Sequence, residues 1–108
     1  MLTKNLLLGS LILTFALSSQ AQSTKISQNC TFEGVPLYGK VQVVNSFPDF
    51  KVQVVNHFPD LKVKTVNSFP KSCGKWQFVN SFPDFKVQFV NSFPDFKIQF
   101  VQFNEGLK

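Results

Sequence analysis

Two cysteines are the clearest candidates for covalent chemistry in this 108-residue chain, which contains Cys30 and Cys73 and no others. In an oxidising compartment, two cysteines in one small chain favour a single disulfide. A bond between Cys30 and Cys73 would close a long loop, and on the chain-entropy argument it would contribute roughly 4 kcal/mol to stability. Two free thiols, or a metal or redox role, are the alternatives. A zinc site is not indicated, because the chain has one histidine and no paired cysteine motif.

Aspartates form the second group of candidates. They recur at one position of a repeated segment, each two residues before a lysine: Asp49, Asp60, Asp84 and Asp95. As calcium ligands they would have to converge from separate turns and supply about six to eight oxygens. The pattern favours local turn hydrogen bonds and weak surface ion pairs over acid/base chemistry. We therefore expect no metal and no cofactor.

His57 and Trp76 are single residues that suit a binding or catalytic site. His57 stands where other copies of the repeat have Ser, and it lacks the nearby Ser or Cys and acid of a catalytic triad. We interpret it as repeat drift at a turn. Trp76 replaces Val in its copy, and we favour a core or junction residue over a ligand-binding aromatic. With no Gly-rich phosphate loop and no Ser nucleophile elbow, the chain is predicted not to be an enzyme.

The N-terminus has the order of a secretory signal peptide. Lys4 supplies a positive charge, and residues 6–17 form an apolar run. That run is too short to span a bilayer, which needs about 20 residues. Ser19 and Ala21 are small residues at positions −3 and −1 of a cleavage site. We predict that residues 1–21 are a signal peptide cleaved after Ala21; a buried N-terminal helix or a membrane anchor is the alternative.

The rest of the chain is predicted to be an extension over 22–36 and one domain over 37–108, exported to the periplasm or secreted. Hydrophobic residues make up 44% of the chain and aromatic residues 15%, which excludes a disordered protein. The net charge of +5, with lysine but no arginine, is too modest for a nucleic-acid binder. No second apolar stretch is long enough for a membrane span in the exported chain.

An 11-residue repeat dominates the sequence from Val41 onward. The copy that starts at Val87 reads V-Q-F-V-N-S-F-P-D-F-K. Copies begin at Val41, Val52, Val63, Trp76, Val87 and Ile98. Two extra residues, Gly74 and Lys75, separate the third copy from the fourth. The chain therefore divides into two similar halves of three units, with a half junction at Gly74, Lys75 and Trp76.

Each unit is predicted to be one short strand and one turn. Val87 and Phe89 would share one face of the strand, while Gln88 and Val90 take the other. The proline that follows suits a turn and cannot donate to a strand ladder, so it must lie at a strand end or turn. The pattern indicates an all-β fold, drawn from the residues alone as a small β-solenoid or an up-and-down β-barrel. Near-identical strands invite edge pairing, so the fold must close or protect its edges.

Phenylalanine is in excess, with 14 in the chain. The Phe before each Pro and the Phe or Leu after each Asp recur in register: Phe47 with Phe50, Phe58 with Leu61, Phe82 with Phe85, and Phe93 with Phe96. Turns are normally polar, so two large apolar residues in each turn predict that the connections themselves pack inward.

These segments together resemble the 7(1) septoil knot domain, a small all-β family of unknown function. The resemblance covers Leu37 to about Gly106. It is carried by Gly74-Lys75-Trp76, by the Asp-Phe-Lys steps at 84–86 and 95–97, and by Phe100-Val101. The C-terminal unit departs from it, because Q-F-N-E-G replaces another N-S-F-P turn. The resemblance implies a chain wound into a seven-crossing torus knot of short strands, and it brings no catalytic residues.

We therefore expect an exported, non-enzymatic, compact β-repeat protein with a structural or interaction role. One alternative is a binding module whose repeated Lys, Asp and Gln face recognises a cell-envelope or extracellular polymer. Another is a self-assembling surface protein. The sequence names no partner, and a monomer is expected.

Overall fold

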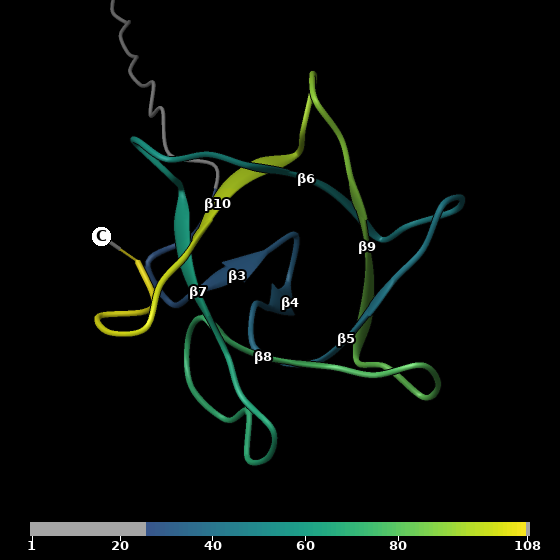
Figure 1. Cartoon of the computed structure of the whole chain (residues 1–108), viewed down its shortest axis with the longest axis horizontal. Coiled ribbons are helices and arrows are strands. Elements are labelled where there is room, and N and C mark those ends of the chain that lie inside the picture. The colour runs from purple at the N-terminus through teal and green to yellow at the C-terminus, as the bar shows by residue number, and fades with distance from the viewer. Residues whose placement is uncertain (1–25, 108) are drawn as a thin grey trace, which may run out of the picture.

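The computed structural model describes residues 26–107, and the predicted signal peptide lies outside them (Figure 1). The elements are β3 (Thr31–Phe32), β4 (Val35–Pro36), β5 (Gly39–Val43), β6 (Phe50–Val54), β7 (Leu61–Thr65), β8 (Lys75–Phe78), β9 (Phe85–Phe89) and β10 (Phe96–Phe100). The described part is therefore all-β, as predicted. Each repeat unit supplies one of the strands β5 to β10.

Strands β5 to β10 close into one barrel in the order β10-β6-β9-β5-β8-β7. This order alternates between the first half of the repeat (β5, β6, β7) and the second half (β8, β9, β10), so the two halves interleave. All neighbouring strands are parallel, and the up-and-down direction drawn from the pattern is therefore wrong. Closure leaves these strands without a free edge, which removes the risk that repeated strands pose.

A stagger of two residues between neighbouring strands explains how such short loops join parallel strands. Val43 at the end of β5 pairs with Val87, and Val87 also pairs with Phe50 at the start of β6. The end of one strand is therefore level with the start of the next-but-one strand, about 10 Å away. Parallel strands ordinarily need a crossover of about a dozen residues or more. Here the loop has only to arch over one intervening strand.

The connection at the half junction differs from the other loops, each of which passes over one intervening strand. β7 is followed by its immediate barrel neighbour β8, and Thr65 pairs with Trp76. The connection therefore crosses no strand. This one shorter step moves β8, β9 and β10 into the gaps between β5, β6 and β7, and the two extra residues of the sequence, Gly74 and Lys75, lie where it occurs.

Two layers of inward-facing side chains fill the barrel. All of them are at most 2% exposed: Phe50, Leu61, Phe85 and Phe96 in one layer, and Val41, Val52, Val63, Trp76, Val87 and Ile98 in the other. The ring of Phe50 packs against those of Phe85 and Phe96, with centroids 5.6 and 5.7 Å apart. Burial of each such side chain stabilises the fold by about 1.5–3 kcal/mol before entropy is counted. Because side chains alternate between the two faces of a strand, every second residue of these six strands points into one shared core.

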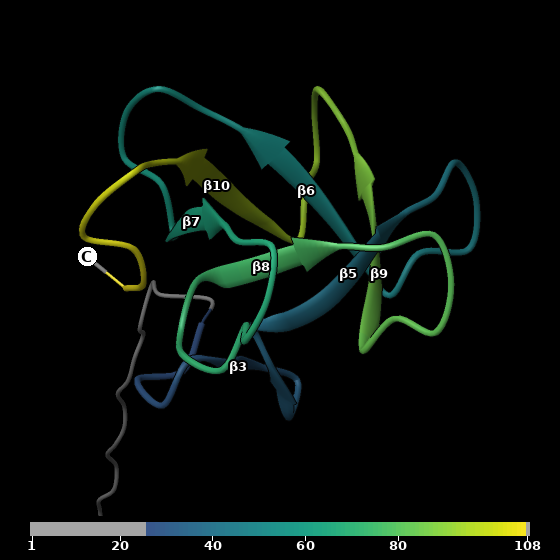
Figure 2. The ribbon, with the colours of Figure 1, turned by 60° about the horizontal axis from the view of Figure 1, so that its bottom comes forward.

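The β3–β4 hairpin covers one end of the barrel (Figure 2). Its turn residues, Glu33 and Gly34, both have positive φ, as a tight two-residue hairpin turn requires. Phe32 packs against Phe50 and Phe96, with ring centroids 5.3 Å from each. The hairpin therefore extends the core beyond the six repeat strands.

Candidate functional site

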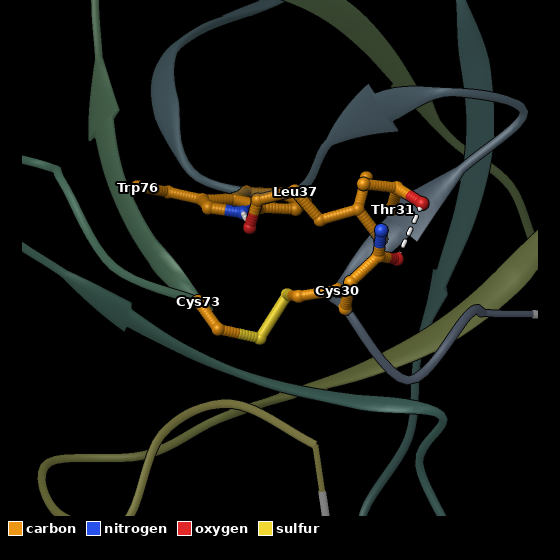
Figure 3. Close-up of a disulfide and its surroundings, with 6 residues drawn as sticks. Cys30, Thr31, Leu37, Cys73 and Trp76 are labelled. Carbon is orange, nitrogen blue, oxygen red and sulfur yellow. Dashed lines mark hydrogen bonds between the residues drawn. A yellow bond between two sulfur atoms is a disulfide. The ribbon is translucent and has the colours of Figure 1, made fainter.

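Cys30 and Cys73 form a disulfide, which confirms the predicted pairing (Figure 3). Their Cα atoms are 5.9 Å apart. Cys30 precedes the hairpin and Cys73 precedes β8, so the bond fastens the hairpin to the half junction. Neither sulfur is available as a thiol or a metal ligand.

Trp76 lies in the core, as favoured from the sequence. Its side chain is fully buried and its indole Nε1 donates a 3.1 Å hydrogen bond to the carbonyl oxygen of Leu37 (Figure 3). Its ring also packs edge-on against Phe85, with centroids 5.6 Å apart. An indole that is buried and hydrogen-bonded in this way holds the junction together and offers no face to a ligand.

The other two junction residues also have contacts within the fold. Gly74 is buried with φ of 84°, and a Cβ at this position would collide with the carbonyl oxygen of Lys62. The Lys75 ammonium lies 3.9 Å from a carboxylate oxygen of Glu105, in the last loop. Glycine is therefore required at 74 both by its backbone conformation and by the close approach of the neighbouring chain.

The aspartates of the repeat clamp the loops to the barrel. The carboxylate of each accepts a hydrogen bond of 2.7–2.8 Å from the backbone N–H of a lysine in the strand beneath the loop. The pairs are Asp49–Lys86, Asp60–Lys97, Asp84–Lys40 and Asp95–Lys51. The backbone N–H of each Asp donates in return to the carbonyl of the same lysine. The expected local turn bonds are thus replaced by bonds between segments 37 or 44 residues apart.

Glutamines hold the other end of the same loops. Their side-chain Nε2 atoms donate bonds of 3.1–3.3 Å to asparagine carbonyls, in the pairs Gln42–Asn80, Gln53–Asn91, Gln88–Asn45 and Gln99–Asn56. Each arch is therefore fixed at both of its ends. The sequence suggests that these Asp and Gln side chains form a polymer-binding face, but in the structure they are hydrogen-bonded to the backbone of other segments of the chain.

The Phe before each Pro stands at the outer end of its arch. These five residues, here called the tip phenylalanines, are 75–92% exposed: Phe47, Phe58, Phe69, Phe82 and Phe93. The prediction that they pack inward is wrong, whereas the Phe or Leu after each Asp is buried. The reason for four of them is the arch itself. Because those loops pass over the outer face of a paired strand, that strand separates the middle of the loop from the core.

All five tip phenylalanines adopt a left-handed backbone, with φ between 53° and 56°. This conformation costs a bulky residue about 1–2 kcal/mol. The equivalent position of the last unit is Asn104, with φ of 63°, and asparagine tolerates this region well. The repeat thus has an exposed phenylalanine at a position where asparagine can adopt the same left-handed turn conformation. Exposed residues held in such strain gather at functional sites.

A second apolar surface surrounds the end of the barrel opposite the hairpin. It consists of the last residues of five strands, here called the mouth ring, each 37–48% exposed: Val43, Val54, Phe78, Phe89 and Phe100. Alternation along the strands directs these side chains to the same face as the core. In agreement, the Phe78 ring lies 6.1 Å from that of Trp76.

A groove opens where the repeat is interrupted. Two hollows of about 430 and 450 Å³ adjoin, because both are lined by Pro70, Lys71 and Asp84. Lys40 and Gln77, which pair across β5 and β8, line the first of them. The loop after β7 starts against β8, where the Val66 N–H donates to the carbonyl oxygen of Trp76, but it has Lys71 in place of the Asp that binds the other loops to a strand. We call these two hollows the junction groove.

The junction groove combines positive charge with aromatic and polar groups. Ser68 and Phe69 line it from the loop, and Tyr38 lines it from the segment before β5. Two lysines face one aspartate, whose Oδ2 atom already accepts the backbone N–H of Lys40. Gln77 is unlike the other repeat glutamines, because within residues 26–107 its amide has no loop carbonyl as a partner. Its hydrogen-bonding groups therefore remain available in the groove.

His57 lies at an exposed tip beside Phe58, with ring centroids 6.4 Å apart. In the part of the chain that the structure describes, no three His, Cys, Asp or Glu side chains are grouped to hold a metal ion. The described residues also include no helix of the length and apolarity needed to cross a membrane.

Residues 34–107 match the 7(1) septoil knot domain. The chain belongs to this family. The match takes in the whole interleaved barrel, and the resemblance found in the sequence is confirmed. A search of the curated proteins finds no match to this chain.

The candidate site of this septoil knot domain does not follow from the repeat pattern, yet the sequence carried a signal for it. Lys71 stands where four other units have Asp, and Lys64 stands where other units have Gln. The hollows lie beside these two positions, since a third hollow of about 550 Å³ is lined by Lys64 and Phe103. At Lys71 and Lys64, the departures from the repeat mark places where the Asp or Gln that clamps the other loops is missing.

Proposed function

We propose that this septoil knot domain is an exported, non-enzymatic interaction module that binds an extended partner outside the cytoplasm through its exposed loops. The observation that carries the proposal is the set of tip phenylalanines, which are 75–92% exposed in a strained backbone conformation. Large apolar side chains grouped on a surface generally mark interaction sites. Neither the exposure nor the strain stabilises the folded chain, so both favour a role in binding.

The scaffold suits such a role because it holds the loops in fixed positions. Each clamped arch has an Asp at one end and a Gln-bound Asn at the other, as in the loop between Asn91 and Asp95. A binding surface that is rigid before it meets its partner loses less entropy on binding. The Asp and Gln side chains thus serve the interaction indirectly, by positioning the rings.

The arrangement of the loops favours a flexible polymer over a flat surface. The loops radiate outward around the barrel (Figure 1), so a planar bilayer reaches only neighbouring tips at one time. A polymer chain can follow the circumference and contact several tips in turn. Such repeated weak contacts increase the overall affinity without any single strong site.

Export is supported by the disulfide between Cys30 and Cys73, since such bonds persist in oxidising compartments. The test is the intact mass of the protein isolated from its own cells without reductant. We expect a chain that begins at Gln22 with both cysteines oxidised. A full-length, reduced protein in the cytoplasm would overturn the export proposal.

The binding role is tested with a variant in which all five tip phenylalanines are replaced by Asn, the residue found at position 104. The wild type and the variant are compared for retention on purified cell walls and extracellular polysaccharide of the producing cells. We expect the wild type to be retained and the variant to pass through. A matched control replaces Ser46, Ser81 and Ser92, which are exposed and directly precede tips, by Ala. Equal retention of all three proteins at every salt concentration contradicts the proposal.

The mouth ring favours self-association as a second candidate function. Five apolar side chains, each 37–48% exposed, meet at one end of a barrel that has no free strand edge. Two copies would therefore associate end to end through side chains and not through strand pairing. Sedimentation of the wild type and of Phe89→Glu over a wide concentration range tests this. A wild type that remains monomeric throughout excludes it.

A further inference from the structure

We propose that the junction groove binds an acidic saccharide chain whose sugar rings carry carboxylates. The inference rests on the proposed function and names the chemical class of the partner. It assigns the recognition of the acidic sugars to one place in the fold, the connection between β7 and β8, while the other loop tips add contacts along a longer chain.

The groove is a consequence of how the two halves are joined. Every clamped arch of the barrel has a strand beneath it, with a Gln and a Lys of that strand bound to the loop. The loop at 66–71 bonds to β8 at its start, where the Val66 N–H donates to the carbonyl oxygen of Trp76, but Lys71 replaces the Asp that ties the other loops down at their far end. The space under this end of the loop is therefore open, and Lys40 and Gln77 line it.

Charge selects an anionic ligand. Lys40 and Lys71 line the first hollow together with Asp84, and the second hollow shares Lys71 and Asp84. One oxygen of the Asp84 carboxylate is held by the backbone of Lys40, at 2.8 Å. Lysines offer compact, mobile point charges that attract single anionic groups, so the sugar-binding groups beside them are what favour a carboxylate on a saccharide over a phosphate.

The remaining lining groups suit a sugar ring. Phe69 lines the first hollow and is 75% exposed, less than the 85–92% of the other tip phenylalanines. An aromatic face provides an apolar platform for the C–H face of a pyranose ring. The Gln77 amide and the hydroxyls of Ser68 and Tyr38 provide donors and acceptors for sugar hydroxyls.

The shape favours a chain over a compact small molecule. The two hollows, of about 430 and 450 Å³, adjoin along Pro70, Lys71 and Asp84 and form one open groove. Each volume is within the range of about 300–1,000 Å³ that is usual for ligand sites. A linear oligomer can therefore fill one hollow with one ring and continue into the next.

The experiment titrates the disulfide-bonded protein with a hexamer of galacturonic acid, using calorimetry and the amide NMR signals of Gln77 and Phe69. We expect saturable binding that weakens with salt and is absent for a neutral glucose hexamer. Lys40→Gln and Lys71→Gln are each expected to weaken binding by about three- to fivefold. Lys51 is the control, because it occupies the position of Lys40 in β6 and lies outside the groove. Lys51→Gln is expected to leave binding unchanged.

A second pair of variants separates this proposal from the broader one. Phe69→Asn is expected to weaken hexamer binding, while Phe93→Asn, at a tip outside the groove, leaves it unchanged. Equal loss in both variants would overturn the groove assignment but retain the proposed function. No saturable binding at millimolar hexamer and low salt would overturn the saccharide proposal. So would tighter binding of polyphosphate that is insensitive to Phe69→Asn, because charge alone would then explain the groove.

Discussion

Phe93 and Phe96 lie three residues apart in one connection, yet the first ring is 91% exposed and the second is fully buried. Between them, the Asp95 carboxylate accepts the backbone N–H of Lys51, at 2.7 Å, and so fixes the chain to the outside of β6. Phe93 remains on the arch, while Phe96 begins β10 and faces the core. Two residues of the same type thus have opposite environments because of one clamp.

Replacing these two residues has opposite effects on stability. We expect Phe96→Ala to lower the free energy of unfolding by about 3–5 kcal/mol, because it leaves a cavity in the first core layer. We expect Phe93→Asn to leave it unchanged or raise it by up to about 1 kcal/mol, because the left-handed strain is relieved. Urea denaturation of both variants measures the difference. A loss at Phe93 as large as that at Phe96 would show that the tip ring is packed in solution.

The clamp itself is tested by Asp95→Ala. This variant leaves the Lys51 N–H without its acceptor and is expected to lower the free energy of unfolding by about 1–2 kcal/mol. Hydrogen exchange at the Lys51 amide should accelerate more than exchange elsewhere in β6. Glu33→Ala is the control, since Glu33 is an exposed acid in the hairpin turn. Unchanged exchange at Lys51 would argue that the bond is not made in solution.

Removal of the disulfide is expected to loosen the hairpin first. The double variant Cys30→Ser, Cys73→Ser should lower the free energy of unfolding by about 2–5 kcal/mol, because the unfolded chain is no longer cross-linked. Exchange of the Phe32 amide should increase before that of the barrel strands, since only packing then holds the hairpin in place. Ser72→Ala, next to the bridge, serves as the control. A double variant as stable as the wild type would contradict this role.

Refolding is expected to be slow for a chain of this size. Apart from β7 and β8, neighbouring strands of the barrel join segments 37 or 44 residues apart, as the clamps at Asp49 and Asp84 illustrate. Folds dominated by such distant pairings refold on timescales of about milliseconds to seconds, and the interleaved halves place this chain at the slow end or beyond it. Stopped-flow fluorescence of Trp76 with the disulfide intact measures the rate. Complete refolding within a millisecond is the contradictory outcome.

Local chemistry allowed much of the fold to be predicted from the sequence. The β-branched and aromatic alternation around Val87 defines a strand, and Pro94 cannot continue one, so strands and connections follow from nearest neighbours. The Cys30–Cys73 bond and the buried Trp76 were also predictable, because two cysteines have one possible partner each and a lone Trp in a strand suits a core. The resemblance to the septoil knot domain rests on the same local segments.

The tertiary structure alone decided the direction of the strands, the interleaving of the two halves and the fate of the phenylalanines. The sequence alone determined the strands, the turns, the pairing of the cysteines and the place where the repeat is interrupted. Each of these depends on residues close in the chain or on a single possible partner. Whether Phe93 faces solvent and Gln77 faces a groove depends on which strand lies beneath each loop. That is a property of the closed barrel, because only closure with a two-residue stagger sets which distant segments meet.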